Sequence, residues 1–167
     1  ARYARPFRIC FFDVKSERLS DVCSTAREDG AIGIIAFDVD RENLVDLLLA
    51  SKLPAVFVDC ISFGRPIDLV KADNFEGSKR ATRCVLQTTP GPLAFIGGMS
   101  SRKEGSPHKE RLDGFIAAHA EAGREVREEY IMLASVEREF GRHAVSVMSQ
   151  LPAPPTGYVC SDDDLAF

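Results

Sequence analysis

Acidic side chains follow two short apolar runs, and an arginine lies between them in the sequence. Asp59 comes directly after "AVFV", Asp162 begins three consecutive aspartates after "GYVCS", and Arg111 precedes "LDGF". Carboxylates accept hydrogen bonds from hydroxyl groups, and a guanidinium donates several in a planar fork. These side chains together suit the binding of a polyhydroxylated or acidic small molecule.

Each of these residues also has a purely structural interpretation. A carboxylate after a strand often forms a turn or caps a helix, so both interpretations stay open for Asp59. The aspartates at 162–164 could hold Mg²⁺ for phosphoryl transfer, because hard oxygens are its preferred ligands. Without a second acidic cluster, we favour helix capping plus one ligand contact at Asp162. A surface salt bridge would explain Arg111 taken alone.

Short apolar runs rich in β-branched and aromatic residues alternate with segments of helical periodicity. This pattern predicts an α/β doubly wound fold with parallel strands and crossover helices. We expect strands at residues 7–12, 31–37, 55–58, 93–96, 130–133 and 158–160. Because ligands bind at the carboxyl ends of such strands, Asp59, Gly97, Gly98, Val136 and Asp162 are expected on one rim.

Five helices are expected between these strands, and each is assigned an apolar face. They cover residues 19–26 and 44–49, a third helix capped by Asp73 or Asn74, and residues 106–123 and 138–150. Ser106 before Pro107 suits a helix start. The side chains expected to face inward on the last three are Ala81, Cys84 and Val85; Leu112, Phe115, Ile116 and His119; and Ala144, Val145 and Met148.

Composition excludes several classes of protein. The formal net charge is −4 and the pI is near 5.4, so no large basic nucleic-acid surface is expected. The five cysteines are an odd number, scattered and mostly within apolar runs, which predicts buried reduced thiols in a cytoplasmic protein. Neither metal-ligand spacing nor an apolar run of membrane-spanning length is present, so we expect no metal, cofactor or membrane contact.

Five segments, taken in order, carry a family resemblance. They are "KLPAVFVD", "LVKADNFEGSKRAT", "LAFIGG", "ERLDGFIAAHAEAG" and "YVCSDDDLAF". In this order they resemble the effector-binding domain of the LacI/GalR family of bacterial transcription regulators. The resemblance implies a two-lobed, type I periplasmic-binding-protein-like fold with parallel sheets, incomplete at both ends. The first lobe would span residues 1–90 and the second 91–167, with the turn "QTTPGP" between them.

The resemblance also implies ligand contacts at particular positions. Asp59 matches the acidic contact of the family, and Arg111 matches the arginine that holds ligand hydroxyls or a carboxylate. Asp162 occupies the place of an asparagine in the "ND" pair, and Asp163 matches the aspartate. Val136 lies where some members place a stacking aromatic, so stacking by this residue is lost.

The function implied is ligand sensing, with no catalysis. A small effector, most simply a sugar, would bind between the lobes of a cytoplasmic homodimer. Operator DNA would be bound by a headpiece that is not in this sequence. A solute-binding protein of a sugar ABC transporter is the alternative with the same fold. A Mg²⁺-dependent phosphoryl-transfer enzyme using residues 162–164 is the alternative from a different class.

Overall fold

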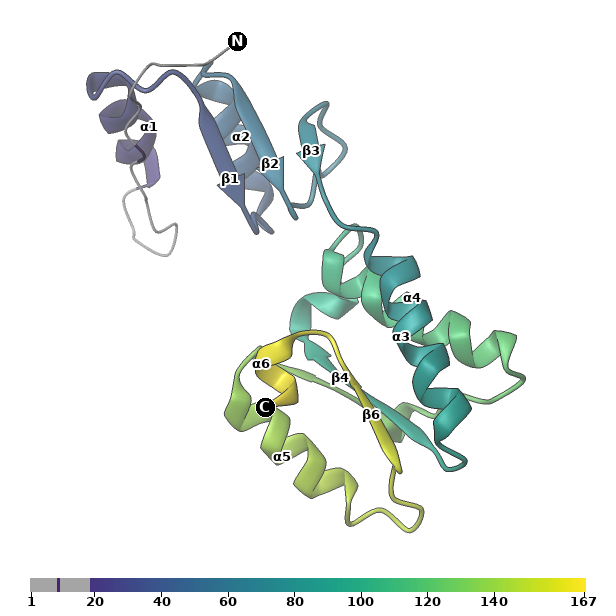
Figure 1. The fold of residues 1–167 in the computed structure, drawn as a ribbon. Coiled ribbons are helices and arrows are strands. Elements are labelled where there is room, and N and C mark those ends of the chain that lie inside the picture. The colour runs from purple at the N-terminus through teal and green to yellow at the C-terminus, as the bar shows by residue number, and fades with distance from the viewer. Residues whose placement is uncertain (1–8, 10–18) are drawn as a thin grey trace.

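The computed structural model, which describes residue 9 and residues 19–167, contains two parallel three-stranded sheets in separate lobes (Figure 1). The first sheet has the order β1-β2-β3, formed by Ile34–Phe37, Ala55–Val58 and Asp68–Val70. The second has the order β5-β4-β6, formed by Ile131–Ala134, Leu93–Gly98 and Gly157–Cys160. The parallel α/β prediction is confirmed. The strand expected at 7–12 lies outside the described residues except for residue 9.

The first lobe packs α2 (Glu42–Ala50) against one face of its sheet. Val45 and Phe57 are fully buried there, because an apolar stripe on the helix meets the alternate side chains of the strands. The opposite face is apolar but exposed, with Ile35 at 68% and Phe37 at 67% of their full accessible surface. A further helix of this lobe is α1 (Leu19–Glu28), which Gly30 follows in the left-handed conformation.

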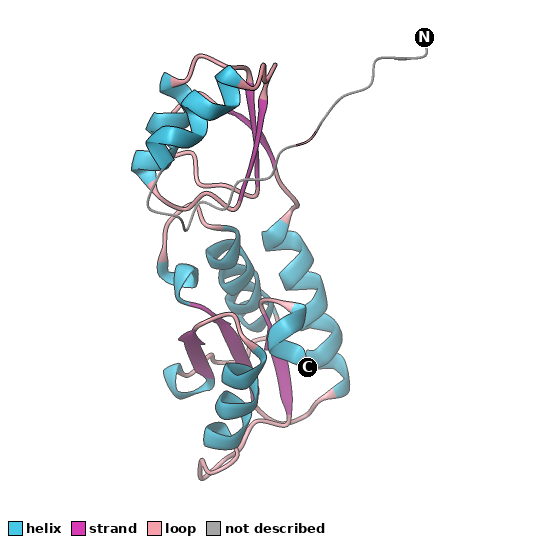
Figure 2. Ribbon diagram, turned by 90° about the vertical axis from the view of Figure 1, so that its left-hand side faces the viewer, coloured by secondary structure: helices cyan, strands magenta, loops and turns pink. Residues whose placement is uncertain are grey.

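The second lobe covers both faces of its sheet (Figure 2). Alternate residues of β4 serve two cores, because successive side chains of a strand point to opposite faces. Ala94 and Ile96 pack with α5 (Arg138–Met148) and α6 (Asp163–Ala166), whereas Leu93 and Phe95 pack with α4 (Pro107–Glu121). Every residue of β4 is buried. Two short 3₁₀ helices, η1 (Met99–Arg102) and η2 (Glu128–Tyr130), complete the lobe.

Helix α3 (Asn74–Thr88) belongs with the second sheet by its packing. It lies along α4 and contacts β6, and Val85 and Leu86 pack on the core that contains Phe115. Gly114 of α4 allows this close approach, since a Cβ there would lie 2.4 Å from the Phe75 carbonyl oxygen. The chain therefore changes lobes just before α3, at residues 71–73, and not at the expected turn near residue 90.

Several expected inward faces are corrected by the structure. Ile116 and Val145 are 41% and 39% exposed, and Ala81 and Cys84 are also exposed. In α4 and α5 the contact faces include Gly114 and Gly141, which apolar periodicity does not reveal. A Cβ on Gly141 would lie 2.2 Å from the Leu165 carbonyl oxygen, so backbone contact sets the orientation of α5.

The structure also adds a strand and tests the predicted burial of the cysteines. Strand β3 was not expected, because "DLV" is too short to show a period. Cys23 and Cys60 are buried as predicted, whereas Cys84 is exposed and Cys10 lies outside the described residues. Within the described part of the chain, no helix is long and apolar enough to cross a membrane.

Candidate functional site

The carboxyl ends of strands from both lobes face one another. Asp38 follows β1, Asp59 follows β2 and Asp162 follows β6, and α4 contributes His108 and Arg111 from its first turns. Two ion pairs lie near these residues. Lys103 Nζ of the second lobe contacts Asp40 Oδ2 of the first at 3.1 Å, and Lys71, in the connection between the lobes, pairs with Glu110. We call the facing groups the interlobe site: Asp38, Asp40 and Asp59 on the first lobe, and His108, Arg111 and Asp162 on the second.

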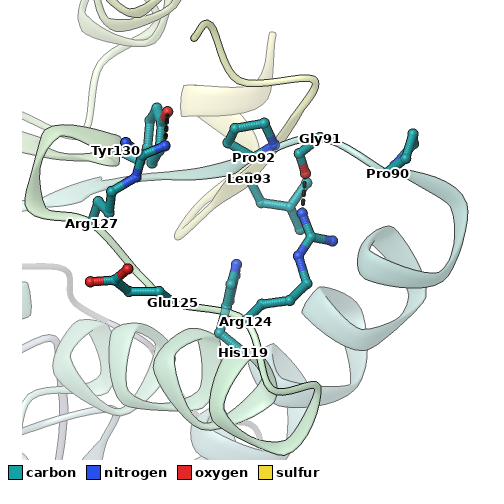
Figure 3. Close-up of a pocket in the computed structure, with 9 residues that line it drawn as sticks. All are labelled: Pro90, Gly91, Pro92, Leu93, His119, Arg124, Glu125, Arg127 and Tyr130. Atoms are coloured by element: carbon teal, nitrogen blue, oxygen red, sulfur yellow. Dashed lines mark hydrogen bonds between the residues drawn. The ribbon is translucent and has the colours of Figure 1, made fainter.

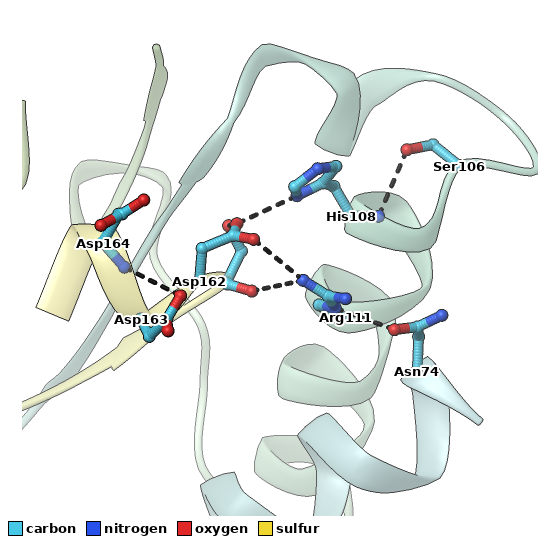
Figure 4. Close-up of polar contacts among 8 residues, drawn as sticks. Asn74, Ser106, His108, Arg111, Asp162, Asp163 and Asp164 are labelled. Atoms are coloured by element: carbon cyan, nitrogen blue, oxygen red, sulfur yellow. Dashed lines mark hydrogen bonds and ion pairs between the residues drawn. The ribbon is translucent and has the colours of Figure 1, made fainter. Parts of the chain in front are cut away.

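Arg111 is held by three partners from two separate segments (Figure 4). Its Nε donates to Asn74 Oδ1 at 2.9 Å, and its Nη1 donates to the Ser161 carbonyl oxygen at 2.6 Å and to Asp162 Oδ1 at 3.2 Å. Asn74 is buried at the start of α3, where the Asp73 side chain caps the helix. These bonds fix the guanidinium at the rim, and two of its five N–H groups are placed on acceptors of one strand end.

Asp162 is the most strongly stabilised carboxylate of the site. Burial would raise its pKa, but His108, a hydrogen bond from Ser161 and the charge of Arg111 lower the pKa to about 2. Ser161 Oγ donates to Asp162 Oδ2 at 2.6 Å, and His108 Nδ1 lies 3.3 Å from the same oxygen, without good hydrogen-bond geometry. The predicted ligand residues Arg111 and Asp162 are therefore in direct contact.

The three consecutive aspartates have separate positions. Asp162 points toward Arg111, and its side chain does not cap α6; Asp163 Oδ1 accepts a hydrogen bond from the Asp164 backbone N–H at 3.1 Å (Figure 4). Asp163 and Asp164 are exposed. Among the described residues, no group of three His, Cys, Asp or Glu side chains could hold a metal ion. The observed geometry gives the Mg²⁺ hypothesis no ligand set.

Asp59 lies on the opposite side of the interlobe site from Arg111. Its backbone is in the left-handed region with φ 51°, which aspartate tolerates better than most residues. Its Oδ1 has essentially no exposed surface and no hydrogen-bond partner in the described structure. A buried carboxylate oxygen without a partner is costly, which marks it as a group that a ligand could satisfy.

Val136 lies beside the second-lobe rim. It is 37% exposed, and a Cβ built on Gly98 would lie 2.9 Å from its Cγ2 and 3.8 Å from His108 Nδ1. The absence of a side chain on Gly98 thus lets Val136 and His108 converge at the end of β4. Val136 offers a small apolar surface there.

Three residues of the interlobe site, Asp38, Asp40 and His108, were missed from the sequence. Asp38 directly follows the strand "IIAF", as Asp59 follows "AVFV", so the same strand-end rule could have found it. Partial burial raises the pKa of Asp38, His108 opposes this, and the carboxylates of Asp40, Asp162 and Asp59 raise it further. His108 had no sequence signal, because it meets Asp162 only through folding.

Two hollows of the surface lie away from the interlobe site. One, of about 440 Å³, is at the amino end of β4, opposite the interlobe site, and includes His119, Arg124 and Tyr130 (Figure 3). Arg124 donates to the carbonyl oxygens of Thr89 and Gly91, and Tyr130 donates to that of Ala153. These side chains are engaged in holding turns together, so this hollow has a structural explanation.

Two facing lobes with parallel sheets, and polar groups at the strand ends between them, define a periplasmic-binding-protein-like ligand-binding domain. The family described as "Periplasmic binding proteins and sugar binding domain of LacI family" matches residues 13–167. The chain belongs to this family, as an effector-binding domain of the LacI type, and the resemblance read from its motifs is confirmed.

Individual relatives agree with this assignment. The chain is 27% identical over 147 residues to the "Probable HTH-type transcriptional repressor ExuR" of Bacillus subtilis (strain 168), covering 88% of the chain and 43% of the relative. It is also 27% identical to the "HTH-type transcriptional repressor PurR" of Actinobacillus pleuropneumoniae serotype 5b (strain L20), covering 88% and 42%. The structure of the regulator CcpA of Lactococcus lactis is similar with a TM-score of 0.76 at 23% identity, covering 89% and 53%. The chain thus spans less than half the length of the ExuR and PurR relatives.

Proposed function

We propose that this chain senses a small effector between its two lobes and thereby controls DNA binding by an intact LacI-type regulator. The observation that carries the proposal is the bonded group Asn74, Arg111, Ser161 and Asp162. It faces Asp38 and Asp59, whose carboxylates have no ion pair among the described residues. The second-lobe wall of the site, which contains Arg111 and Asp162, presents oriented donors and acceptors. The first-lobe wall, which contains Asp38 and Asp59, presents acceptors alone. Such walls suit a polyhydroxylated molecule, and the family description favours a sugar.

Regulation would proceed by differential binding. A ligand that bonds to both walls stabilises one angle between the lobes, and the coupled headpieces of a homodimer then gain or lose operator affinity. No chemical step is required of the domain, and the protein would act in the cytoplasm where its operator is. Asp59, Arg111 and Asp162 are the proposed ligand contacts, with Val136 as a small apolar neighbour.

The test uses the full-length protein, its operator DNA and a panel of sugars and nucleosides. A true effector should raise the thermal midpoint and change operator affinity. Arg111→Ala should weaken effector binding by roughly tenfold to a hundredfold, since a charge-assisted hydrogen bond contributes about 1.5–3 kcal/mol. Basal operator binding should be retained.

Arg83→Ala is the matched control, because Arg83 pairs with Glu121 on an exposed surface of the second lobe. If Arg111→Ala and Arg83→Ala bind the effector with equal affinity, the ligand does not use the interlobe site. A protein that binds sugar but shows no operator affinity would favour the transporter alternative.

A further inference from the structure

The first-lobe wall carries two neighbouring carboxylates at the ends of adjacent strands. Phe37 of β1 is paired with Val58 of β2, so Asp38 and Asp59 are the next residues on both strands. Adjacent strands lie about 5 Å apart, which brings the two residues close together. Both have a left-handed backbone, with φ 52° and 51°. Two equivalent strand ends therefore place an acidic residue in the same unusual conformation.

Among the described residues, these two carboxylates are the acidic groups of the interlobe site without an ion-pair partner, although His108 lies near enough to Asp38 to lower its pKa. Asp40 is paired with Lys103, and Asp162 is paired with Arg111 and lies next to His108. No ion pair or side-chain hydrogen bond engages Asp38 or Asp59 within the described part of the chain, and Asp59 Oδ1 is an orphaned, fully covered acceptor. The site thus combines an unused pair of anions with an unpartnered polar atom.

A neutral sugar would leave this pair without a counter-charge. When a ligand excludes water, the repulsion between adjacent carboxylates grows because the local dielectric constant falls. A protonated amine supplies both the positive charge and three N–H donors. A metal ion is a poorer counter-charge, because no described group of three acidic, His or Cys side chains could coordinate it.

We propose that the effector carries a protonated amino group that lies against Asp38 and Asp59, so that amino sugars and similar amine-bearing polyols are the preferred class. Its hydroxyl groups would bond to Arg111 and Asp162 on the second lobe. This proposal rests on the proposed function, because it names the chemistry of the ligand at the same site. Asp38 becomes a specificity-determining residue that discriminates amines from neutral sugars.

The binding experiment compares matched compounds on the full-length protein. The probes are glucosamine, galactosamine and mannosamine, each beside its parent hexose and its N-acetyl derivative, which lack the charge. At least one amino sugar should bind about tenfold or more tightly than both counterparts, and its advantage should shrink as salt screens the charge. In Asp38→Asn and Asp59→Asn the advantage should be lost. Asp46→Asn, which removes a first-lobe carboxylate paired with Arg65, should retain it.

A second measurement needs no ligand. In the free protein, Asp38→Asn and Asp59→Asn should each raise the thermal midpoint at low salt, because each relieves like-charge repulsion. The double variant should gain less than the sum of the two, since the repulsion can be removed only once. Asp40→Asn should not raise the midpoint, because its partner Lys103 is left unpaired.

The outcomes separate this proposal from the function on which it depends. Equal or tighter binding of a neutral hexose or nucleoside, lost in Arg111→Ala but unchanged in Asp38→Asn, would overturn the amine proposal and leave the sensor function standing. Amino sugars that show no advantage, together with additive midpoints in the two variants, would also overturn it. If no compound binds and none alters operator affinity, both proposals fail.

Discussion

The two walls of the interlobe site differ in how completely their polar groups are bonded. On the second lobe, Arg111 and Asp162 are tied to Asn74 and Ser161 by hydrogen bonds of 2.6 to 3.2 Å. On the first lobe, Asp38 and Asp59 have left-handed backbones and no described side-chain partners. One wall is organised before a ligand arrives, and the other keeps its acceptors free.

The supporting sheets differ in the same direction. The second sheet is buried on both faces and holds β4 at its centre, whereas the first sheet has one face exposed in the described structure. A wall fixed by a two-sided core loses little freedom on binding, which favours affinity. Unpaired groups on a less covered sheet are better suited to select between ligands. The comparison predicts that the second lobe governs stability and the first governs specificity.

The largest expected effect comes from the core behind the second wall. Phe115 is fully buried between α4 and β4, so Phe115→Ala should lower the free energy of unfolding by about 3–5 kcal/mol. Ile116, its neighbour on the same helix, is 41% exposed. Ile116→Ala should therefore cost about 1 kcal/mol or less. Denaturant titration measures both values, and equal losses would show that α4 does not pack as described.

Substitutions of two glycines, one on α3 and one on α4, test the assignment of α3 to the second lobe. A Cβ on Gly114 would lie 2.4 Å from the Phe75 carbonyl oxygen, so Gly114→Ala should destabilise the protein by up to about 3 kcal/mol. Gly77 of α3 has no atom within 4 Å of such a Cβ. Gly77→Ala should instead stabilise by about 0.5–1 kcal/mol through helix propensity. Thermal unfolding distinguishes the two, and a stabilising Gly114→Ala would contradict the close contact between α3 and α4.

These glycines also show where sequence reasoning succeeds and fails. Helix starts and strand ends follow local rules, so Ser106 before Pro107 and Asp59 after "AVFV" were placed correctly from residue types alone. A helix contact made through the backbone of a glycine adds no apolar side chain to the sequence, so apolar periodicity does not reveal it. Ile116 and Val145 were therefore expected inside, although Gly114 and Gly141 occupy the contact faces.

The site was predictable only to the extent that it follows the same local rules. Arg111 and Asp162 were proposed as ligand residues, and the structure brings them into contact at 3.2 Å. The buried Asn74 that orients Arg111 was considered only as a possible cap, because its bond joins residues far apart in the chain. The lobe boundary was misplaced for a related reason, since a turn at 87–92 marks a change of element and not a change of packing partner.

The bonding of Asp162 predicts that the stability of the second lobe depends on pH in the acid range. Its folded pKa of about 2 lies below the ordinary value of 3.8, so its stabilising contribution is complete above about pH 4–5 and is lost as the pH falls through 2. Asp162→Asn should lower the free energy of unfolding at neutral pH by about 2 kcal/mol and flatten its decline between pH 4 and 2. Asp164→Asn is the exposed control. If the free energy of unfolding depends on pH identically in both variants, Asp162 is not stabilised by the bonds described for it.

The smallest expected effect on stability concerns the link between the walls. Lys103 Nζ lies 3.1 Å from Asp40 Oδ2 across the lobes, and both side chains are about half exposed. Such a pair contributes about 0.5 kcal/mol or less, so Lys103→Ala should barely change the thermal midpoint. It should nevertheless open the lobes at low salt, because this contact joins them directly. Small-angle scattering should show a larger radius of gyration for Lys103→Ala but not for Lys109→Ala, whose partner Asp113 lies on the same helix. In about 1 M salt the wild-type protein should approach the dimensions of Lys103→Ala, since exposed ion pairs are then screened.

Unchanged dimensions under both conditions would contradict this prediction. They would mean that the backbone connection at residues 71–73 sets the angle between the lobes, without a contribution from the ion pair.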